Sequence, residues 1–197
     1  MTDGVDLKKR RLLTATTAVV GAVGAGFAIW PFIASMNPSA RAKSAGAPVE
    51  ADISKLEPGG LLRVKWRGKP VWIVRRTDQN IADLEGLSGV LADPASDIPQ
   101  QPEYARNAHR SRKPEFLVAV GICTHLGCSP TYRPEVAAAD LGADWKGGGF
   151  CPCPGSKFDL AGRVFSGAPA PTNLEVPPYQ YLGVTRVLIG EDGEAAG

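Results

Sequence analysis

The sequence has few aromatic residues, few histidines and almost no net charge. Aromatic side chains make up 7% of the 197 residues, only two histidines are present, and the formal net charge is +2. A charge balance so close to zero, with the basic residues dispersed along the chain, argues against a nucleic-acid partner. The two histidines, His109 and His125, also limit how many imidazole ligands any metal site could have.

Glycine and proline are abundant, with 23 and 17 copies. Together with the low aromatic content, they favour many turns and short strands over a helical bundle. The chain is 44% hydrophobic, which is enough for one core of roughly 130–150 residues and a separate apolar segment. We therefore expect a mainly β fold with one globular domain.

Charged side chains are missing from residues 12–40. The apolar stretch within this region is about 25 residues long, which is enough to cross roughly 30 Å of hydrocarbon. It predicts a single transmembrane anchor over residues 12–36. A cleaved signal peptide is the alternative, but its apolar region is usually only about 7–15 residues long, so the length favours a retained anchor.

The basic cluster in residues 8–11 directly precedes the anchor. Such a cluster favours an N-terminus in the cytoplasm, so we expect a cytoplasmic tail of residues 1–11. The anchor would then cross a bacterial inner membrane, and the head would lie in the periplasm. The pair Arg10 and Arg11 also resembles a weak twin-arginine export signal. The simpler alternative is that these two positive charges only set the orientation of the anchor in the membrane. Residues 37–50 are small and polar, with Pro38 and Pro48, and predict a flexible hinge.

The head, residues 51–197, shows the period-2 alternation of antiparallel strands. The patterns predict a hairpin over residues 62–74, a short helix over 81–87, a surface loop over 93–114, a buried strand over 116–120, a second hairpin over 158–165 and a closing strand over 181–189.

The four cysteines form two tight pairs, Cys123 with Cys128 and Cys151 with Cys153, which is typical of a site and not of a scattered disulfide framework. Taken alone, the spacings C-x-H-x2-C and C-x-C suggest zinc, because thiolate and imidazole both suit that ion.

The two strings themselves are more specific than their spacings. Residues 123–128 read CTHLGC and residues 151–156 read CPCPGS, and they resemble the two metal-binding boxes of Rieske iron–sulfur proteins, the second at five of six positions. The GAPAP loop at residues 167–171 adds to the resemblance. It implies a Rieske-type antiparallel β-sandwich head with a small cluster-binding subdomain at about residues 116–172.

The resemblance also implies a [2Fe–2S] cluster with two thiolate and two imidazole ligands. Cys123 and Cys151 would be the thiolate ligands, and His125 would be one imidazole ligand. Cys128 and Cys153 would form a disulfide between the two loops, which requires an oxidising compartment and so agrees with a periplasmic head.

Four other residues take roles from the resemblance. Leu126 and Gly127 would lie against the cluster, where Leu126 would shield it near the quinol site; an apolar loop residue that packs on its neighbours is the alternative for Leu126. The Ser156 hydroxyl would donate a hydrogen bond to a cluster sulfide, and a turn serine that caps backbone groups is the alternative for Ser156. Phe158 stands where many family members carry a tyrosine that donates to a ligand sulfur. A phenylalanine cannot donate, so the resemblance predicts a lower midpoint potential than a tyrosine would give.

Pro154 departs from the family pattern, because it stands where the family carries its second histidine ligand. Proline has no side-chain lone pair and no backbone N–H, so it cannot replace an imidazole. Replacement by His109 would need a large loop movement, and a solvated loop residue is the simpler role for His109. Three origins are compatible with Pro154: a deliberate replacement of the ligand, an error in the sequence or a recent inactivating change, and a natural lineage with altered ligation.

Three functions follow. The first is the electron-transfer subunit of a respiratory quinol:cytochrome c oxidoreductase, in which His125 meets ubiquinol and the head passes the electron to cytochrome c1 within a complex, expected to be dimeric, that also contains cytochrome b. The second is a redox-silent subunit of the same complex, because Pro154 predicts poor cluster incorporation. The third is a zinc module on Cys123, His125, Cys151 and one further thiol.

Overall fold

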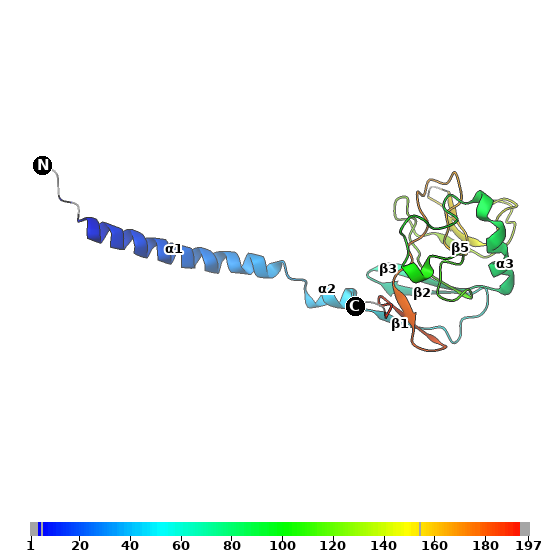
Figure 1. The fold of residues 1–197 in the computed structure, drawn as a ribbon, viewed down its shortest axis with the longest axis horizontal. Coiled ribbons are helices and arrows are strands. Elements are labelled where there is room, and N and C mark those ends of the chain that lie inside the picture. The colour runs from blue at the N-terminus through cyan, green and yellow to red at the C-terminus, as the bar shows by residue number, and fades with distance from the viewer. Residues whose placement is uncertain (1–3, 5, 154, 194–197) are drawn as a thin grey trace. The chain divides into compact units, whose positions relative to one another are not determined.

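The computed structural model describes residues 4, 6–153 and 155–193, and the chain divides into two units at residues 44 and 45. The first unit contains α1, Leu7–Ser35, and most of the short α2, Ala40–Ala45 (Figure 1). Asp6 caps α1 by accepting hydrogen bonds from the backbone N–H groups of Lys8 and Lys9. By length and composition, α1 could cross a membrane, with a mean hydropathy of 1.8.

Two details of this region differ from the sequence-based expectation. The helix begins at Leu7, five residues before the predicted anchor, so the basic cluster forms its first turns. The predicted hinge is not all coil, because α2 lies within it and β1, Val49–Asp52, begins before residue 51. Alanine dominates α2, and its high helix propensity accounts for this turn and a half of helix.

The described residues of the second unit form three three-stranded antiparallel sheets. Their strand orders are β1–β9–β8, β2–β3–β4 and β5–β6–β7. The remaining strands are β2, Leu61–Trp66; β3, Lys69–Arg75; β4, Phe116–Val120; β5, Thr131–Arg133; β6, Gly148–Cys151; β7, Ser156–Phe158; β8, Tyr179–Tyr181; and β9, Arg186–Ile189. The helices are α3, Asp78–Gly86, and the short 3-10 turns Ser88–Val90 and Glu103–Ala105.

The sheet β2–β3–β4 is the middle layer of the head. Along β4, Phe116, Val118 and Val120 pack into a core shared with β1, β8 and β9, while Leu117 and Ala119 pack into a second core shared with β6 and β7. Side chains alternate between the faces of a strand, so burial of all five residues of β4 means that both faces are covered. This confirms the predicted buried strand.

The first hairpin and the short helix are also confirmed. Strands β2 and β3 pair from Leu61 with Val74 to Trp66 with Lys69, and α3 is capped by Thr77, which exchanges hydrogen bonds with Asn80.

Three other expectations were wrong in detail. The predicted closing strand is a hairpin, β8 and β9, in which Tyr181 pairs with Val187. The second predicted hairpin is reduced to an isolated bridge between Phe158 and Val164, because the Asp159 carboxylate accepts backbone hydrogen bonds that close a tight turn after β7. The predicted surface loop over 93–114 is partly buried, and Arg110 within it is fully buried.

Candidate metal centre

The first loop of the site leaves the end of β4 and carries Cys123 to Cys128. It closes on itself, because the N–H of Cys123 donates to the carbonyl of Cys128 at 2.7 Å and the N–H of Gly127 donates to the carbonyl of Cys123 at 3.0 Å. Gly127 has a φ of 83°, the left-handed conformation that glycine adopts most easily. The loop is therefore a self-supporting turn.

The second loop joins β6 to β7 and repeats this construction. Cys151 and Ser156 are paired across the hairpin, and the N–H of Gly155 donates to the carbonyl of Cys151 at 2.9 Å. Gly155 has a φ of 78°, again left-handed. In both loops a glycine four residues after a cysteine closes the turn. Pro154, the predicted position of altered ligation, lies outside the described residues.

A third loop, the predicted GAPAP segment at residues 167–171 with Thr172 directly after it, is tied to both of the others. The Ser156 hydroxyl accepts a hydrogen bond from the N–H of Ala170 at 3.0 Å, and Thr124 in the first loop donates its hydroxyl to the carbonyl of Thr172 at 2.7 Å. Ser156 is fully buried, and its hydroxyl proton remains available as a donor. The contact of Thr124 was not predicted, since a threonine in a turn gives no signal of a partner 48 residues away.

The four thiols lie together at the junction of the first two loops. The sulfur atoms of Cys128, Cys151 and Cys153 all lie within 4.8 Å of one another, close enough to hold a metal ion. Cys123 lies outside this group of three but lines the same cavity as Cys128 and Cys153. All four are free thiols in the structure. Cys123 and Cys151 are buried, whereas Cys153 is exposed.

Burial and neighbouring thiols keep two of these sulfurs protonated. Burial raises the pKa of Cys151 to about 12, and the hydrogen bond with Cys123 adds to the effect. The pKa of Cys128 is raised first by the hydrogen bond with Cys153 and then by burial. Because a metal ligand must be a thiolate, a bound cation would have to displace these protons.

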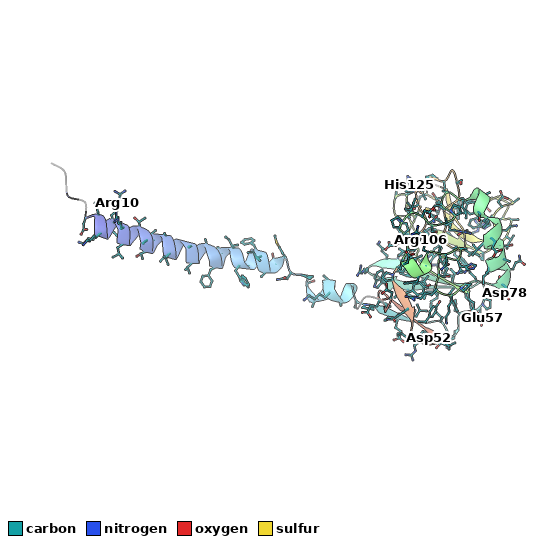
Figure 2. All side chains as sticks on the ribbon, viewed as in Figure 1. Arg10, Asp52, Glu57, Asp78, Arg106 and His125 are labelled. Carbon is teal, nitrogen blue, oxygen red and sulfur yellow. The ribbon has the colours of Figure 1, made fainter. Side chains whose placement is uncertain are left out.

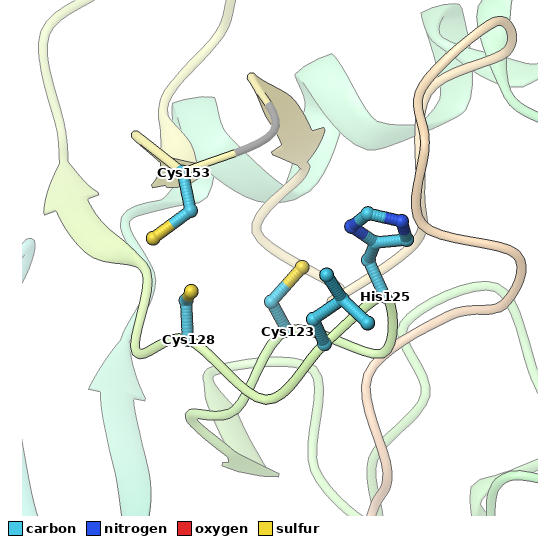
Figure 3. A pocket seen from close by; sticks show the side chains of 5 residues that line it. Cys123, His125, Cys128 and Cys153 are labelled. Carbon is cyan, nitrogen blue, oxygen red and sulfur yellow. The ribbon is translucent and has the colours of Figure 1, made fainter.

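A small cavity of about 180 Å³ opens beside the thiols and is lined by Cys123, His125, Leu126, Cys128 and Cys153 (Figure 3). The sulfur atoms of Cys128 and Cys153 point toward one another, and the His125 ring faces the same space from the other side (Figure 3). His125 and Leu126 are exposed, and His125 lies at the opposite end of the head from Asp52 (Figure 2). The cavity is therefore reached from outside.

A buried charged network holds the turn that follows β7. Arg163 pairs with Asp159 at 2.8 Å, with both side chains almost completely buried. Arg76 and Arg110 lie nearby and donate to the carbonyls of residues 160–162. Burial lowers the pKa of each to about 10, and the Asp159 carboxylate opposes this effect. No pattern in the sequence indicated this network, because isolated arginines in a polar loop are usually solvated.

The structure thus gathers most of the predicted site residues. Gly127 closes the first loop, and Ser156 stands at the base of the second. His109 is not among the residues that line the cavity. It was predicted to be solvated, but it is half-buried, its carbonyl accepts a hydrogen bond from Arg76, and burial lowers its pKa.

The donor atoms fit a two-thiolate, two-imidazole cluster only in part. Cys123, Cys151 and His125 provide three donors of the types that such a cluster takes. Of the described residues that line the cavity, one is a histidine, His125, whereas such a cluster takes two imidazoles. The same loops hold two more thiols than that ligand set uses. The arrangement is therefore one imidazole short for a Rieske cluster and rich in sulfur.

Comparisons with known proteins identify the family of the chain. The family model described as "Ubiquitinol-cytochrome C reductase Fe-S subunit TAT signal" matches residues 1–39. The ubiquinol-cytochrome c reductase iron-sulfur subunit of Allochromatium vinosum is 66% identical over 193 residues, covering 98% of this chain and 93% of that protein. The corresponding subunit of Blastochloris viridis is 44% identical, covering 95% and 96%.

A mitochondrial protein is similar at a comparable level of identity. The cytochrome b-c1 complex subunit Rieske of Solanum tuberosum is 45% identical over 163 residues, covering 82% of this chain and 54% of that protein. Identity at this level over most of the chain establishes the family. The chain belongs to the Rieske iron–sulfur subunits of ubiquinol–cytochrome c reductase, the electron-transfer subunits of the cytochrome b-c1 complex.

Proposed function

We propose that this chain is the electron-transfer subunit of a respiratory ubiquinol:cytochrome c oxidoreductase and that Pro154 impairs its loading with a [2Fe–2S] cluster. The observation that carries the proposal is the convergence of Cys123, Cys151 and His125 at one end of the head. These are three donors of the required types in a chain of this family. The partners are cytochrome b and cytochrome c1, in a complex we propose to be dimeric.

The membrane arrangement follows from charge and length. Helix α1 serves as the anchor, and the basic residues in its first turns favour a cytoplasmic N-terminus. The head then lies in the periplasm of a bacterial cell. That compartment is oxidising and allows the predicted disulfide between Cys128 and Cys153, whose sulfurs are neighbours. The match of residues 1–39 to an export-signal family supports a role of Arg10 and Arg11 as a twin-arginine signal.

The exposed residues of the first loop are suited to meet a quinol. His125 carries an imidazole at the rim of the cavity, where it can hold a hydrogen bond from a ubiquinol hydroxyl and take up its proton. Leu126 is 81% exposed beside it and would be covered by a partner surface when the head docks. When bound, the cluster would supply the one-electron acceptor.

Pro154 removes both a ligand and a second exposed imidazole. A cluster held by three protein donors is bound more weakly than one held by four, because each ligand contributes to the binding free energy. We therefore propose that fewer chains carry the cluster than in a form with histidine at this position.

A matched pair of chains tests the proposal. The native chain and Pro154→His are each produced with cytochrome b and cytochrome c1, and iron, acid-labile sulfide and the EPR spectrum of the reduced membranes are measured. We expect the Pro154→His form to gain iron and a Rieske-type signal relative to the native chain. A native chain with full iron content and a normal spectrum would contradict the role given to Pro154.

The same membranes also test the second candidate function, a redox-silent subunit of the complex. The lack of a fourth cluster ligand at position 154 favours this function. Co-purification of the native chain with cytochrome b and cytochrome c1, with no EPR signal and no turnover of ubiquinol, would select this second function. Failure of both forms to associate with the complex would overturn the assignment as its subunit.

A further inference from the structure

The cysteines at the tip of the head suggest a second use of the same two loops. We propose that, when all four are reduced, Cys123, Cys128, Cys151 and Cys153 form a four-thiolate site for a single soft divalent cation such as zinc. This differs from a Rieske ligand set, which takes two of these sulfurs and two imidazoles. Neither His125 nor position 154 takes part in it.

The distances between the sulfurs suit one metal ion. A tetrahedral zinc site has Zn–S distances of about 2.3 Å, which places its sulfurs roughly 3.8 Å apart. The sulfurs of Cys128, Cys151 and Cys153 already lie within 4.8 Å of one another. A contraction of about 1 Å or less would therefore bring them to zinc geometry. Cys123 lies outside that group of three and supplies the fourth sulfur from the wall of the same cavity, which Cys128 and Cys153 also line.

The loops that carry these sulfurs combine rigid and adjustable parts. Cys151 lies in β6, and the carbonyls of Cys123 and Cys151 each accept a hydrogen bond from the glycine that closes their loop. Cys153 is exposed and Cys128 is half-buried, so their side chains can adjust to an ion. The cavity beside them opens to solvent at His125 and gives the cation a path to the sulfurs.

Two competing states of the same loops define when the site exists. A disulfide between Cys128 and Cys153 would remove two of the four donors, so the site requires reduced thiols. A cluster would occupy Cys123 and Cys151, so the site is favoured where cluster loading is weak. In this respect the inference rests on the proposed effect of Pro154, although the two can fail separately.

Zinc binding by the full-length chain in detergent tests the inference. The metal-free, reduced chain is titrated with zinc chloride, zinc content is measured by atomic emission, and free thiols are counted by alkylation before and after loading. We expect about one zinc per chain and protection of all four thiols from alkylation. Cobalt(II) in place of zinc should give the intense thiolate-to-metal absorption of a sulfur-rich tetrahedral site.

Two variants separate this site from one that uses the cluster ligands. Cys153→Ser should weaken zinc binding at least about 100-fold, since loss of even an outer partner of a metal ligand costs roughly 10–100-fold. His125→Ala removes a cluster ligand from the same loop and should leave zinc affinity unchanged. Equal losses in the two variants would overturn the four-thiolate site in favour of a mixed thiolate–imidazole site.

Oxidation provides the remaining control. Treatment of the metal-free chain with oxidised glutathione should close the Cys128–Cys153 pair and abolish zinc binding, and dithiothreitol should restore it. Zinc retained at full stoichiometry after oxidation would overturn the site. If the native chain lacks a cluster and also binds no zinc, the four-thiolate site is overturned and the proposed effect of Pro154 is not. If the native chain carries a full cluster, the proposed effect of Pro154 is overturned instead.

Discussion

The hydroxyl oxygen of Ser156 accepts a hydrogen bond from the backbone N–H of Ala170 at 3.0 Å, with both residues buried. This contact joins the second metal-binding loop to the GAPAP loop. The resemblance to the Rieske family predicted that Ser156 donates toward a cluster, and the alternative was a serine that satisfies backbone groups. The acceptor role is present in the structure, and it leaves the hydroxyl proton free for the donor role.

Replacement of Ser156 by alanine should therefore destabilise the head even without a metal. The N–H of Ala170 would lose its partner in a buried position, which costs about 1–3 kcal/mol. We expect a lower thermal midpoint for the metal-free Ser156→Ala chain in detergent. Ser88→Ala is the matched control, because the Ser88 hydroxyl makes only a long, exposed contact at 3.4 Å. Equal midpoints for the two variants would show that the Ala170 contact contributes no stability.

Gly127 and Gly155 should tolerate alanine poorly despite open space around them. A Cβ atom added at either position would meet no other atom within 4 Å, so the cost comes from the left-handed backbone alone. An alanine in that conformation costs about 1–2 kcal/mol. Thermal melting of Gly127→Ala and Gly155→Ala should show this loss, whereas Gly89→Ala, which also meets no neighbour and has no left-handed φ, should melt like the native chain. A native-like midpoint for both loop variants would contradict the turn geometry.

Asp159→Asn should be the most destabilising of the polar changes. Its carboxylate pairs with buried Arg163 and opposes the burial cost of Arg76 and Arg110, so its loss leaves buried positive charge without compensation. Removing one partner of a buried pair costs about 3–5 kcal/mol. Asp140→Asn is the control, since the Asp140–Arg133 pair is exposed and worth about 0–1 kcal/mol. The free energies of unfolding from urea titrations of the metal-free chains should differ accordingly, and similar values for the two variants would refute the network's role.

The sequence predicted the parts of the fold that depend on local patterns. Strand alternation indicated the hairpin of β2 and β3, and an unbroken apolar run indicated β4 with both faces buried. The two cysteine boxes identified the site because a motif records which residues meet, even when they lie far apart in the chain. The convergence of Cys123 and Cys151 was predictable in this way.

The parts that the sequence did not predict depend on contacts between distant residues. The loop over residues 93–114 is partly buried because Arg110 donates to carbonyls more than 50 residues away. The link between Thr124 and Thr172 is of the same kind. No local pattern encodes such pairs, because each side chain alone is equally compatible with a solvated loop.

Phe158→Tyr should raise the midpoint potential of the cluster in a chain that can hold one. Phe158 is fully buried in β7 and packs in the same core as Cys123 and Cys151. A tyrosine hydroxyl there is expected to donate to a ligand sulfur, which favours the reduced state and so raises the potential. The comparison is best made in the Pro154→His background, where loading is expected to be higher, by redox titration of the EPR signal. Phe150→Tyr is the control, because Phe150 is only partly buried and packs in a different core. An unchanged potential in Phe158→Tyr, at equal iron content, would show that the hydroxyl does not reach the sulfur.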